Sequence, residues 1–185
     1  MKTVEIDLNK RYTFADYLTW IDDKRRELIN GFVNLMTPAP STRHQIISGG
    51  VYGQFWNQLK KNKCRVFAAP FEVRFPSKSG EVSDDKIYTV VQPDISVVCD
   101  ESKLDERGCI GAPDLIVEIL SIATVKKDVE EKFKLYEENG VLEYWIVHPN
   151  DETLTVFFLE NGKYQHQGIY TRGSKVKVGI FEGKM

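Results

Sequence analysis

Two acidic residues, Asp94 and Glu118, each stand inside a short apolar run with the length and composition of a buried strand, at residues 92–98 and 114–120. Moving an unpaired carboxylate out of water is costly or forces the group to take up a proton. Charged side chains are therefore rarely placed in such runs without a partner. Two carboxylates in one core indicate a bound cation, and they require a fold with a buried sheet.

Strand periodicity places Glu118 in mid-strand, facing whatever covers that side of the sheet. If the strand of Asp94 is its neighbour, the like charges raise one of the two pKa values unless a divalent ion lies between them. Oxygen ligands of this kind favour Mg²⁺ or Mn²⁺ over zinc. The alternative is that Asp94 pairs with an arginine and that Glu118 is a protonated or hydrogen-bonded core residue.

Three further side chains are candidates for the same site, because cleavage of a phosphodiester also needs a positive group that orients water or stabilises developing charge. Lys132 lies at the edge of an expected apolar helix stripe, and its long stem could bring the ammonium to the carboxylates. The alternative is a surface ion pair with Asp128. His44 could carry a proton or contact a phosphate, although a lone histidine on an inward helix face is more often a core residue. Glu27 is an additional acidic candidate.

The composition fits one compact domain over residues 1–185, since 42% of the residues are hydrophobic and 28% are charged. No apolar stretch approaches the ~20 residues that span a bilayer, and the first residues lack the apolar core of a signal peptide. We therefore expect a cytoplasmic protein without a membrane partner. The net charge of −2 argues against a broadly basic nucleic-acid-coating surface but leaves a local basic cleft open.

The cysteines predict a reduced protein. Cys64, Cys99 and Cys109 are odd in number, and no two of them have the C-x-x-C spacing. Neither a disulfide framework nor a zinc knuckle is indicated. We expect three reduced thiols.

The order of apolar patterns predicts a mixed sheet flanked by helices, an α/β or α+β sandwich. Hairpins are expected to turn at Asn30-Gly31 and Asn161-Gly162. Helices are expected at residues 13–21, from 41 or 42 to about 62, and at 124–138, and strands at residues 66–75, 93–98, 114–120 and 143–147.

Several separated stretches carry a family resemblance. They are the sequence Gln92-Pro93-Asp94, residues 112–121, the spacing Asp128-x-x-x-Lys132-x-x-x-Tyr136, residues 140–149, and two N-terminal stretches at residues 26–31 and 37–45. Together they resemble the Uma-two family of restriction endonuclease-like proteins, which are members of the PD-(D/E)XK nuclease superfamily. The likeness covers about residues 12–181.

The resemblance implies a restriction-endonuclease-like core with added N- and C-terminal hairpins. It puts Asp94 at the aspartate of the PD motif and Glu118 at the (D/E) position. The superfamily's lysine two residues later is replaced by Leu120, and the resemblance implies Lys132 as the substitute.

The function expected from the resemblance is a Mg²⁺-dependent or Mn²⁺-dependent endonuclease acting on DNA. Asp94 and Glu118 would hold the metal, Lys132 would position or activate the water, and His44 would assist. A non-catalytic nucleic-acid-binding or protein-interaction module with the same fold is the main alternative, and a hydrolase of small phosphate esters is a third. We also expect a homodimer, from the three tryptophans and the many other aromatic residues.

Overall fold

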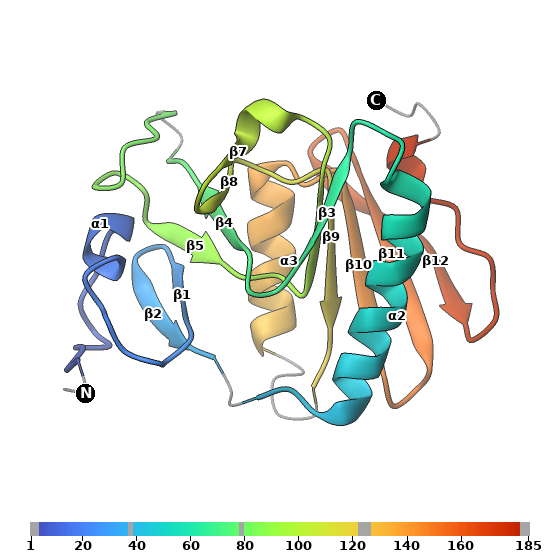
Figure 1. The fold of residues 1–185 in the computed structure, drawn as a ribbon, viewed down its shortest axis with the longest axis horizontal. Helices are drawn as coiled ribbons and strands as arrows, with labels where there is room; N and C mark the ends of the chain where they lie inside the picture. Colours follow the sequence, from blue (N-terminus) through green and yellow to red (C-terminus); the bar gives the residue numbers. More distant parts are fainter. Residues whose placement is uncertain (1–3, 37–38, 78–79, 122–126, 182–185) are drawn as a thin grey trace.

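The computed structural model describes residues 4–36, 39–77, 80–121 and 127–181. In these ranges the strands form two six-stranded mixed sheets (Figure 1). Sheet A contains β1 (Arg26–Ile29), β2 (Phe32–Leu35), β4 (Glu72–Phe75), β5 (Thr89–Val91), β7 (Leu104–Asp105) and β8 (Gly108–Ile110). Sheet B contains β3 (Arg65–Ala68), β6 (Ile95–Val98), β9 (Leu115–Ile119), β10 (Glu143–His148), β11 (Thr153–Glu160) and β12 (Lys163–Thr171). The helices are α1 (Phe14–Tyr17), α2 (Thr42–Leu59) and α3 (Lys127–Asn139), with 3-10 turns η1 (Glu101–Lys103) and η2 (Gly179–Phe181).

The predicted mixed α+β fold is confirmed, but the strands form two sheets where one was expected. The order is β2-β1-β5-β4-β8-β7 in sheet A and β12-β11-β10-β9-β6-β3 in sheet B. The prediction of one strand over residues 66–75 is wrong, because the chain leaves sheet B after β3 and enters sheet A at β4. Pro70 lies between them, and a proline cannot donate a hydrogen bond to a strand ladder. Because of this crossing, β3 and β4 belong to different sheets.

The turns and helix ends follow the local signals in the sequence. Asn30 and Gly31 have φ values of +53° and +87°, which is the left-handed pair that a two-residue hairpin needs. Ser41 caps α2 by accepting a hydrogen bond from the His44 amide, as its position before the helix predicts. Thr13 caps α1, but this helix ends four residues earlier than expected, at Tyr17. The expected start of α3 lies in residues 122–126, outside the described part of the chain.

Three apolar clusters fix the arrangement of the layers. The first joins sheet A, α3 and one face of sheet B, and it includes Val73, Ile116 and Tyr136. The second joins α2 to the opposite face of sheet B, and the third joins α1 to sheet A. Leu115 belongs to the second cluster while Ile116 belongs to the first, so alternate residues of β9 face α2 and α3. Glu118 is two residues after Ile116 and therefore faces α3 and sheet A.

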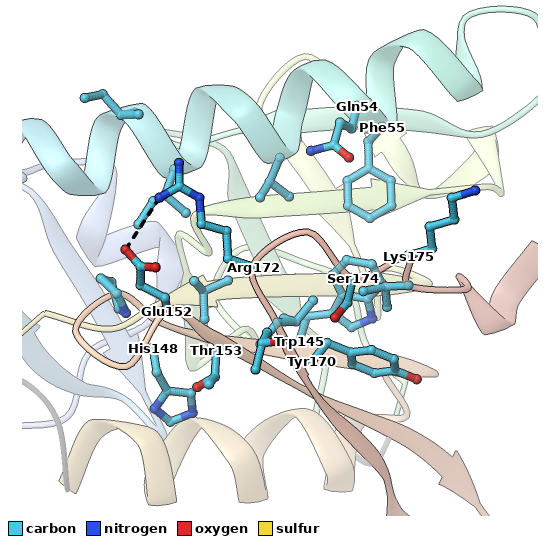
Figure 2. A pocket seen from close by; sticks show the side chains of 18 of the residues that line it. Gln54, Phe55, Trp145, His148, Glu152, Thr153, Tyr170, Arg172, Ser174 and Lys175 are labelled. Carbon is cyan, nitrogen blue, oxygen red and sulfur yellow. Dashed lines mark ion pairs between the residues drawn. The ribbon is translucent and has the colours of Figure 1, made fainter.

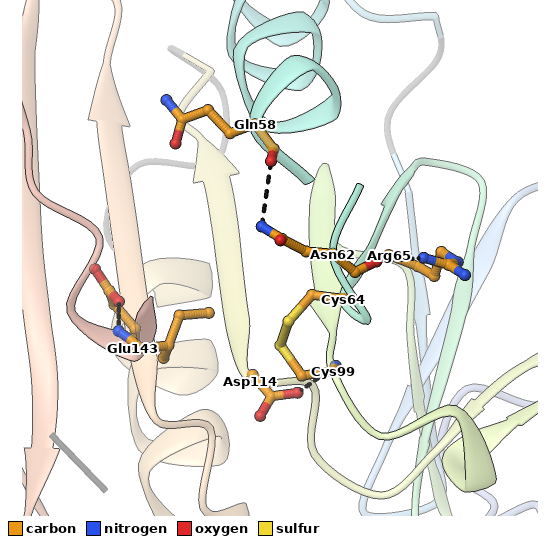
Figure 3. Close-up of a disulfide and its surroundings, with 8 residues drawn as sticks. Gln58, Asn62, Cys64, Arg65, Cys99, Asp114 and Glu143 are labelled. Atoms are coloured by element: carbon orange, nitrogen blue, oxygen red, sulfur yellow. Dashed lines mark hydrogen bonds between the residues drawn. A yellow bond between two sulfur atoms is a disulfide. The ribbon is translucent and has the colours of Figure 1, made fainter. Parts of the chain in front are cut away.

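The expectation of three reduced thiols is wrong, because Cys64 and Cys99 form a disulfide (Figure 3). Arg65 pairs with Val98 in the antiparallel ladder of β3 and β6, so the residues one step further out lie opposite each other. Cys99 follows Cys64 by 35 positions, and this distance along the chain hides the pairing in the sequence. Cys109 is a free, buried thiol.

Reduction of this disulfide is expected to lower the free energy of unfolding by about 2–4 kcal/mol, because the cross-link restricts the unfolded chain. Urea unfolding with and without dithiothreitol measures the difference. A Cys64→Ala, Cys99→Ala double variant is the control, since its midpoint should not respond to the reductant. Equal midpoints for the wild-type protein in both conditions would contradict the expected stabilisation.

No helix in the ranges that the structure covers is both long enough and apolar enough to cross a membrane.

Candidate functional site

Asp94, the residue before β6, lies beside Glu118 of the neighbouring strand β9. Ile95 of β6 pairs with Val117 of β9 in an antiparallel ladder, so the next pair outward is Asp94 and Glu118. Opposed side chains in such a ladder point to the same face. Asp94 Oδ2 also accepts a hydrogen bond from the Ile119 amide at 2.7 Å, which ties this carboxylate to β9. The structure therefore brings the two predicted carboxylates together in sheet B, where β6 begins and β9 ends.

Lys132 connects the two sheets. Its ammonium donates hydrogen bonds to Glu27 Oε1 at 2.9 Å and to Glu118 Oε1 at 3.0 Å. Glu27 comes from β1 in sheet A, whereas Glu118 comes from β9 in sheet B. All three side chains are nearly inaccessible, with exposures of 12% for Lys132, 2% for Glu27 and 12% for Glu118. The Lys132 ammonium thus forms ion pairs with carboxylates from both sheets where the sheets meet.

Tyr136 holds the same carboxylate, although the sequence placed it only on the inward face of its helix and in the family spacing Asp128-x-x-x-Lys132-x-x-x-Tyr136, with no catalytic or binding role. Its hydroxyl donates a 2.6 Å hydrogen bond to Glu118 Oε1. Tyr136 follows Lys132 by four residues, so both side chains leave the same face of α3. This spacing was the available signal, since a buried tyrosine usually finds a partner for its hydroxyl.

His44 contacts the other carboxylate. Its Nε2 lies 3.2 Å from Asp94 Oδ2, and its Nδ1 is buried without a hydrogen-bond partner in the part of the chain that the structure describes. The hydrogen bond to Asp94 raises the pKa of His44 above its usual value, although burial acts in the opposite direction. The first turn of α2 therefore presents an imidazole, favoured in its charged form, to Asp94.

The sequence left open other partners for Asp94, Glu118 and Lys132. Within the described ranges, Asp94 is bound by His44 and the Ile119 amide and not by an arginine. Glu118 is hydrogen-bonded, as one alternative required, but its partners come from the helix that also reaches sheet A. The side chain of Asp128, the alternative partner of Lys132, lies outside the described residues.

Burial controls the protonation of this cluster. Burial raises the pKa of Glu118 and Lys132 lowers it, while the charges of Asp94 and Glu27 raise it, so that the pKa is about 7 in the folded protein. Burial lowers the pKa of Lys132, but the carboxylates of Glu118 and Glu27 outweigh this effect and raise it above the usual value. Lys132 is therefore charged at neutral pH, while Glu118 is close to its own midpoint.

These shifts predict that the protein loses stability as the pH rises. Between pH 4.5 and 7 the unfolded chain has an ionised Glu118 while the folded chain keeps the proton, so ionisation favours unfolding. The His44 contribution is present below pH 6.5 and is lost as the pH rises through its raised pKa. From pH 5.5 to 8 in chelator, the Glu118 effect alone should lower the free energy of unfolding by about 2 kcal/mol. Urea unfolding across this range should show a smaller decrease for Glu118→Gln, and identical pH profiles would contradict the assignment.

The five predicted side chains line one cavity of about 710 Å³ between the two sheets. Those side chains are Glu27, His44, Asp94, Glu118 and Lys132. Arg25 and Arg43, which sequence reasoning did not single out, add two cations to its wall. Arg25 also donates to the Gln92 side chain at 2.9 Å, which holds its guanidinium in place.

The donor set fits a divalent cation with few protein ligands. The side-chain contacts of Asp94 given above go to Oδ2, and both hydrogen bonds of Glu118 go to Oε1, which leaves Asp94 Oδ1 and Glu118 Oε2 for a ligand. Within the described ranges, no three side chains of His, Cys, Asp or Glu form a ready-made metal cluster. Mg²⁺ is commonly bound by one or two carboxylates, with waters and substrate phosphate as its other ligands. Two carboxylates that line one cavity, each with an oxygen that has no hydrogen-bond partner among the described residues, satisfy that requirement.

A family model now identifies the class of protein. The model of Uma2, described as "Putative restriction endonuclease", matches residues 14–183. The chain therefore belongs to the Uma2 family, and the resemblance predicted from the sequence is confirmed.

One solved structure has a similar fold, and two other proteins are similar in sequence. A crystal structure described as "a putative nuclease belonging to DUF820", from Anabaena variabilis, covers 94% of this chain and 93% of its own with a TM-score of 0.70 and 21% identity. This likeness confirms the fold class. An uncharacterized protein of Synechocystis is 28% identical over 134 residues, which is 71% of this chain but only 65% of that relative. A Wolbachia protein named peptide deformylase is 25% identical over 169 residues, 89% of each chain.

Proposed function

We propose that this chain is a metal-dependent nuclease that hydrolyses phosphodiester bonds in DNA. The observation that carries the proposal is the pair Asp94 and Glu118, which lie beside each other where β6 begins and β9 ends and which line the same cavity. Membership of a family described as restriction endonucleases supports the same class of reaction. Asp94 and Glu118 would hold Mg²⁺ or Mn²⁺. When bound, such an ion lowers the pKa of a bound water and neutralises charge on the phosphate.

The remaining side chains have supporting roles in this proposal. Lys132 has three N–H donors, of which two go to Glu27 and Glu118, so one is left for a water or a phosphate oxygen in the cavity. Glu27 is a positioning residue, because its Oε1 accepts from Lys132 and from the Gln92 amide. His44 holds Asp94 in place through Nε2.

The experiment that tests the proposal is nicking of supercoiled plasmid in Mg²⁺, in Mn²⁺ and in chelator. The wild-type protein should nick with either metal and not in chelator, and Asp94→Ala should be inactive. Asp94→Asn keeps an acceptor for the Ile119 amide and should be inactive as well. Asp114→Asn is the matched control, because this carboxylate lies at the other end of β9 and accepts from the Cys99 amide. Full activity of both Asp94 variants would overturn the proposal.

A non-catalytic module with the same fold is the second candidate, supported by Leu120 at the position of the superfamily's lysine. A phosphate-ester hydrolase is the third, and competition by short DNA duplexes should suppress hydrolysis only if DNA is the substrate. The name of the Wolbachia relative points to amide hydrolysis. The chain's three histidines, at positions 44, 148 and 166, do not form the His-Glu-x-x-His zinc motif, so the sequence gives that reaction no support.

The assembly state follows from none of these contacts. A homodimer remains a prediction from the aromatic content of the chain. Sedimentation velocity at two protein concentrations measures it directly, and a single species with the mass of one chain would contradict it.

A further inference from the structure

A second cavity lies beside the proposed active site. It has a volume of about 790 Å³ and is enclosed by α2, the strands β10 to β12 and the segment that follows β12 (Figure 2). Its walls are mainly apolar and include Phe55, Trp145, Val147, Tyr170 and Val176. This volume lies within the range of pockets that bind small organic molecules.

The two cavities adjoin each other. Arg43, His148 and Pro149 line both of them. Arg43 precedes His44, the residue whose imidazole contacts Asp94, so one turn of α2 contributes to both cavities. The two cavities therefore meet at the first turn of α2 and the end of β10, and a strand bound at Asp94 would reach the second cavity around this end of sheet B.

The rim of the second cavity is cationic. Arg43, Arg172 and Lys175 line it, and one carboxylate, Glu152, lies among them. Glu152 is 3.5 Å from Arg43 and 3.9 Å from Arg172, and all three side chains are at least half exposed. Exposed ion pairs of this kind contribute little to stability. A phosphate can therefore replace Glu152 as the partner of the two guanidinium groups, which bind phosphate in a forked geometry.

We propose that this cavity is a nucleotide subsite that takes one unstacked nucleotide of the substrate strand. The base would contact the apolar and aromatic wall, and the adjoining phosphate would bind Arg43 and Arg172. This inference rests on the proposed function, because it extends the substrate from the cleavage site along the same strand. A base paired and stacked in a duplex is not available to such a cavity. The preferred substrate is therefore single-stranded DNA, or a strand opened next to the cleavage site.

Binding in chelator tests the subsite without any cleavage. Fluorescence anisotropy should show a labelled twelve-nucleotide single strand binding at least about tenfold more tightly than the same sequence as a duplex, since each base held by stacking is worth that factor or more. A single strand of equal length made of abasic nucleotides should lose the same factor. Equal affinity for the normal and abasic strands would overturn the subsite, because binding would then depend on phosphates alone.

Glu152→Gln is a second test, in which the affinity for the single strand should increase. Removing this carboxylate frees Arg43 and Arg172, so the single strand should bind about three- to fivefold more tightly. Arg172→Gln should weaken binding by a similar factor. Glu160→Gln is the matched control, because this exposed glutamate lies eight residues after Glu152, at the far end of β11, and its change should alter affinity less than twofold. Equal effects of Glu152→Gln and Glu160→Gln would overturn the assignment of the rim.

The results separate the subsite from the nuclease activity. If the protein nicks plasmid but binds duplex as tightly as single strand, it is a nuclease without the proposed subsite. If it shows the single-strand preference and the Glu152 effect but never nicks, the subsite exists and the protein is the non-catalytic module.

Discussion

Replacement of Glu118 by glutamine is expected to lower metal-dependent cleavage at least about a thousandfold, because metal-ion stabilisation of the transition state is worth several kcal/mol. Glutamine keeps the size of the side chain and one oxygen that can accept the hydrogen bonds from Lys132 and Tyr136. It removes the charge that a divalent cation needs. Initial rates of plasmid nicking in Mn²⁺ measure the loss.

Stability separates this effect from unfolding. Ionisation of Glu118 is opposed by burial, so removal of its charge should leave the melting temperature in chelator unchanged or higher. Asp114→Asn, the same kind of change on the same strand, should retain the wild-type rate. A Glu118→Gln protein that is folded and still cleaves at the wild-type rate would exclude this residue from the mechanism.

Lys132→Met is expected to cost about 3–5 kcal/mol in the free energy of unfolding, since it leaves buried carboxylates without their cation. Glu27 and Glu118 both depend on the Lys132 ammonium at 2.9 and 3.0 Å. The loss should be larger at pH 8 than at pH 6, because Glu118 can take up a proton at the lower pH. Urea unfolding in chelator at the two pH values measures it.

Two further variants identify the source of this loss. Lys134→Met lies on the same helix, and its ammonium is exposed and 3.8 Å from Glu138, so it should change stability by less than about 0.5 kcal/mol. Adding Glu118→Gln to Lys132→Met should recover part of the lost stability. If the Lys132 and Lys134 variants unfold at the same urea concentration, the buried cluster does not depend on this ammonium.

The carboxylate pair was accessible from the sequence because strands have a fixed period. Alternation along residues 114–120 places Glu118 on the face of Ile116, and the apolar run around Asp94 indicates a second buried strand. Two such strands in one sheet are sufficient to bring the acids together if they are neighbours. The order of the strands in sheet B satisfies that condition, with β9 beside β6.

The contacts between the two sheets could not be predicted from the sequence. Glu27 and Lys132 are 105 residues apart, and no local pattern records that β1 and α3 meet. The division into two sheets depends on where the chain crosses after β3, which apolar periodicity does not show. The disulfide likewise follows from the register of β3 on β6 and not from the spacing of its cysteines.

Side chains with both apolar and polar parts were the hardest to assign. Tyr136 has the position of a core residue, and only the location of Glu118 in three dimensions shows that its hydroxyl binds a carboxylate. His44 was predicted on an inward helix face, but its partner Asp94 is 50 residues away. For such residues the sequence predicts burial, while the partner depends on tertiary packing.

Calorimetric titration with Mn²⁺ measures metal binding at Asp94 and Glu118 without any assumption about the substrate. We expect the wild-type protein and Asp114→Asn each to bind Mn²⁺ at one site per chain. Asp94→Asn and Glu118→Gln, both folded, should lose that site. If these two variants bind Mn²⁺ with the wild-type affinity, or if the wild-type protein does not bind it, Asp94 and Glu118 do not form a metal site.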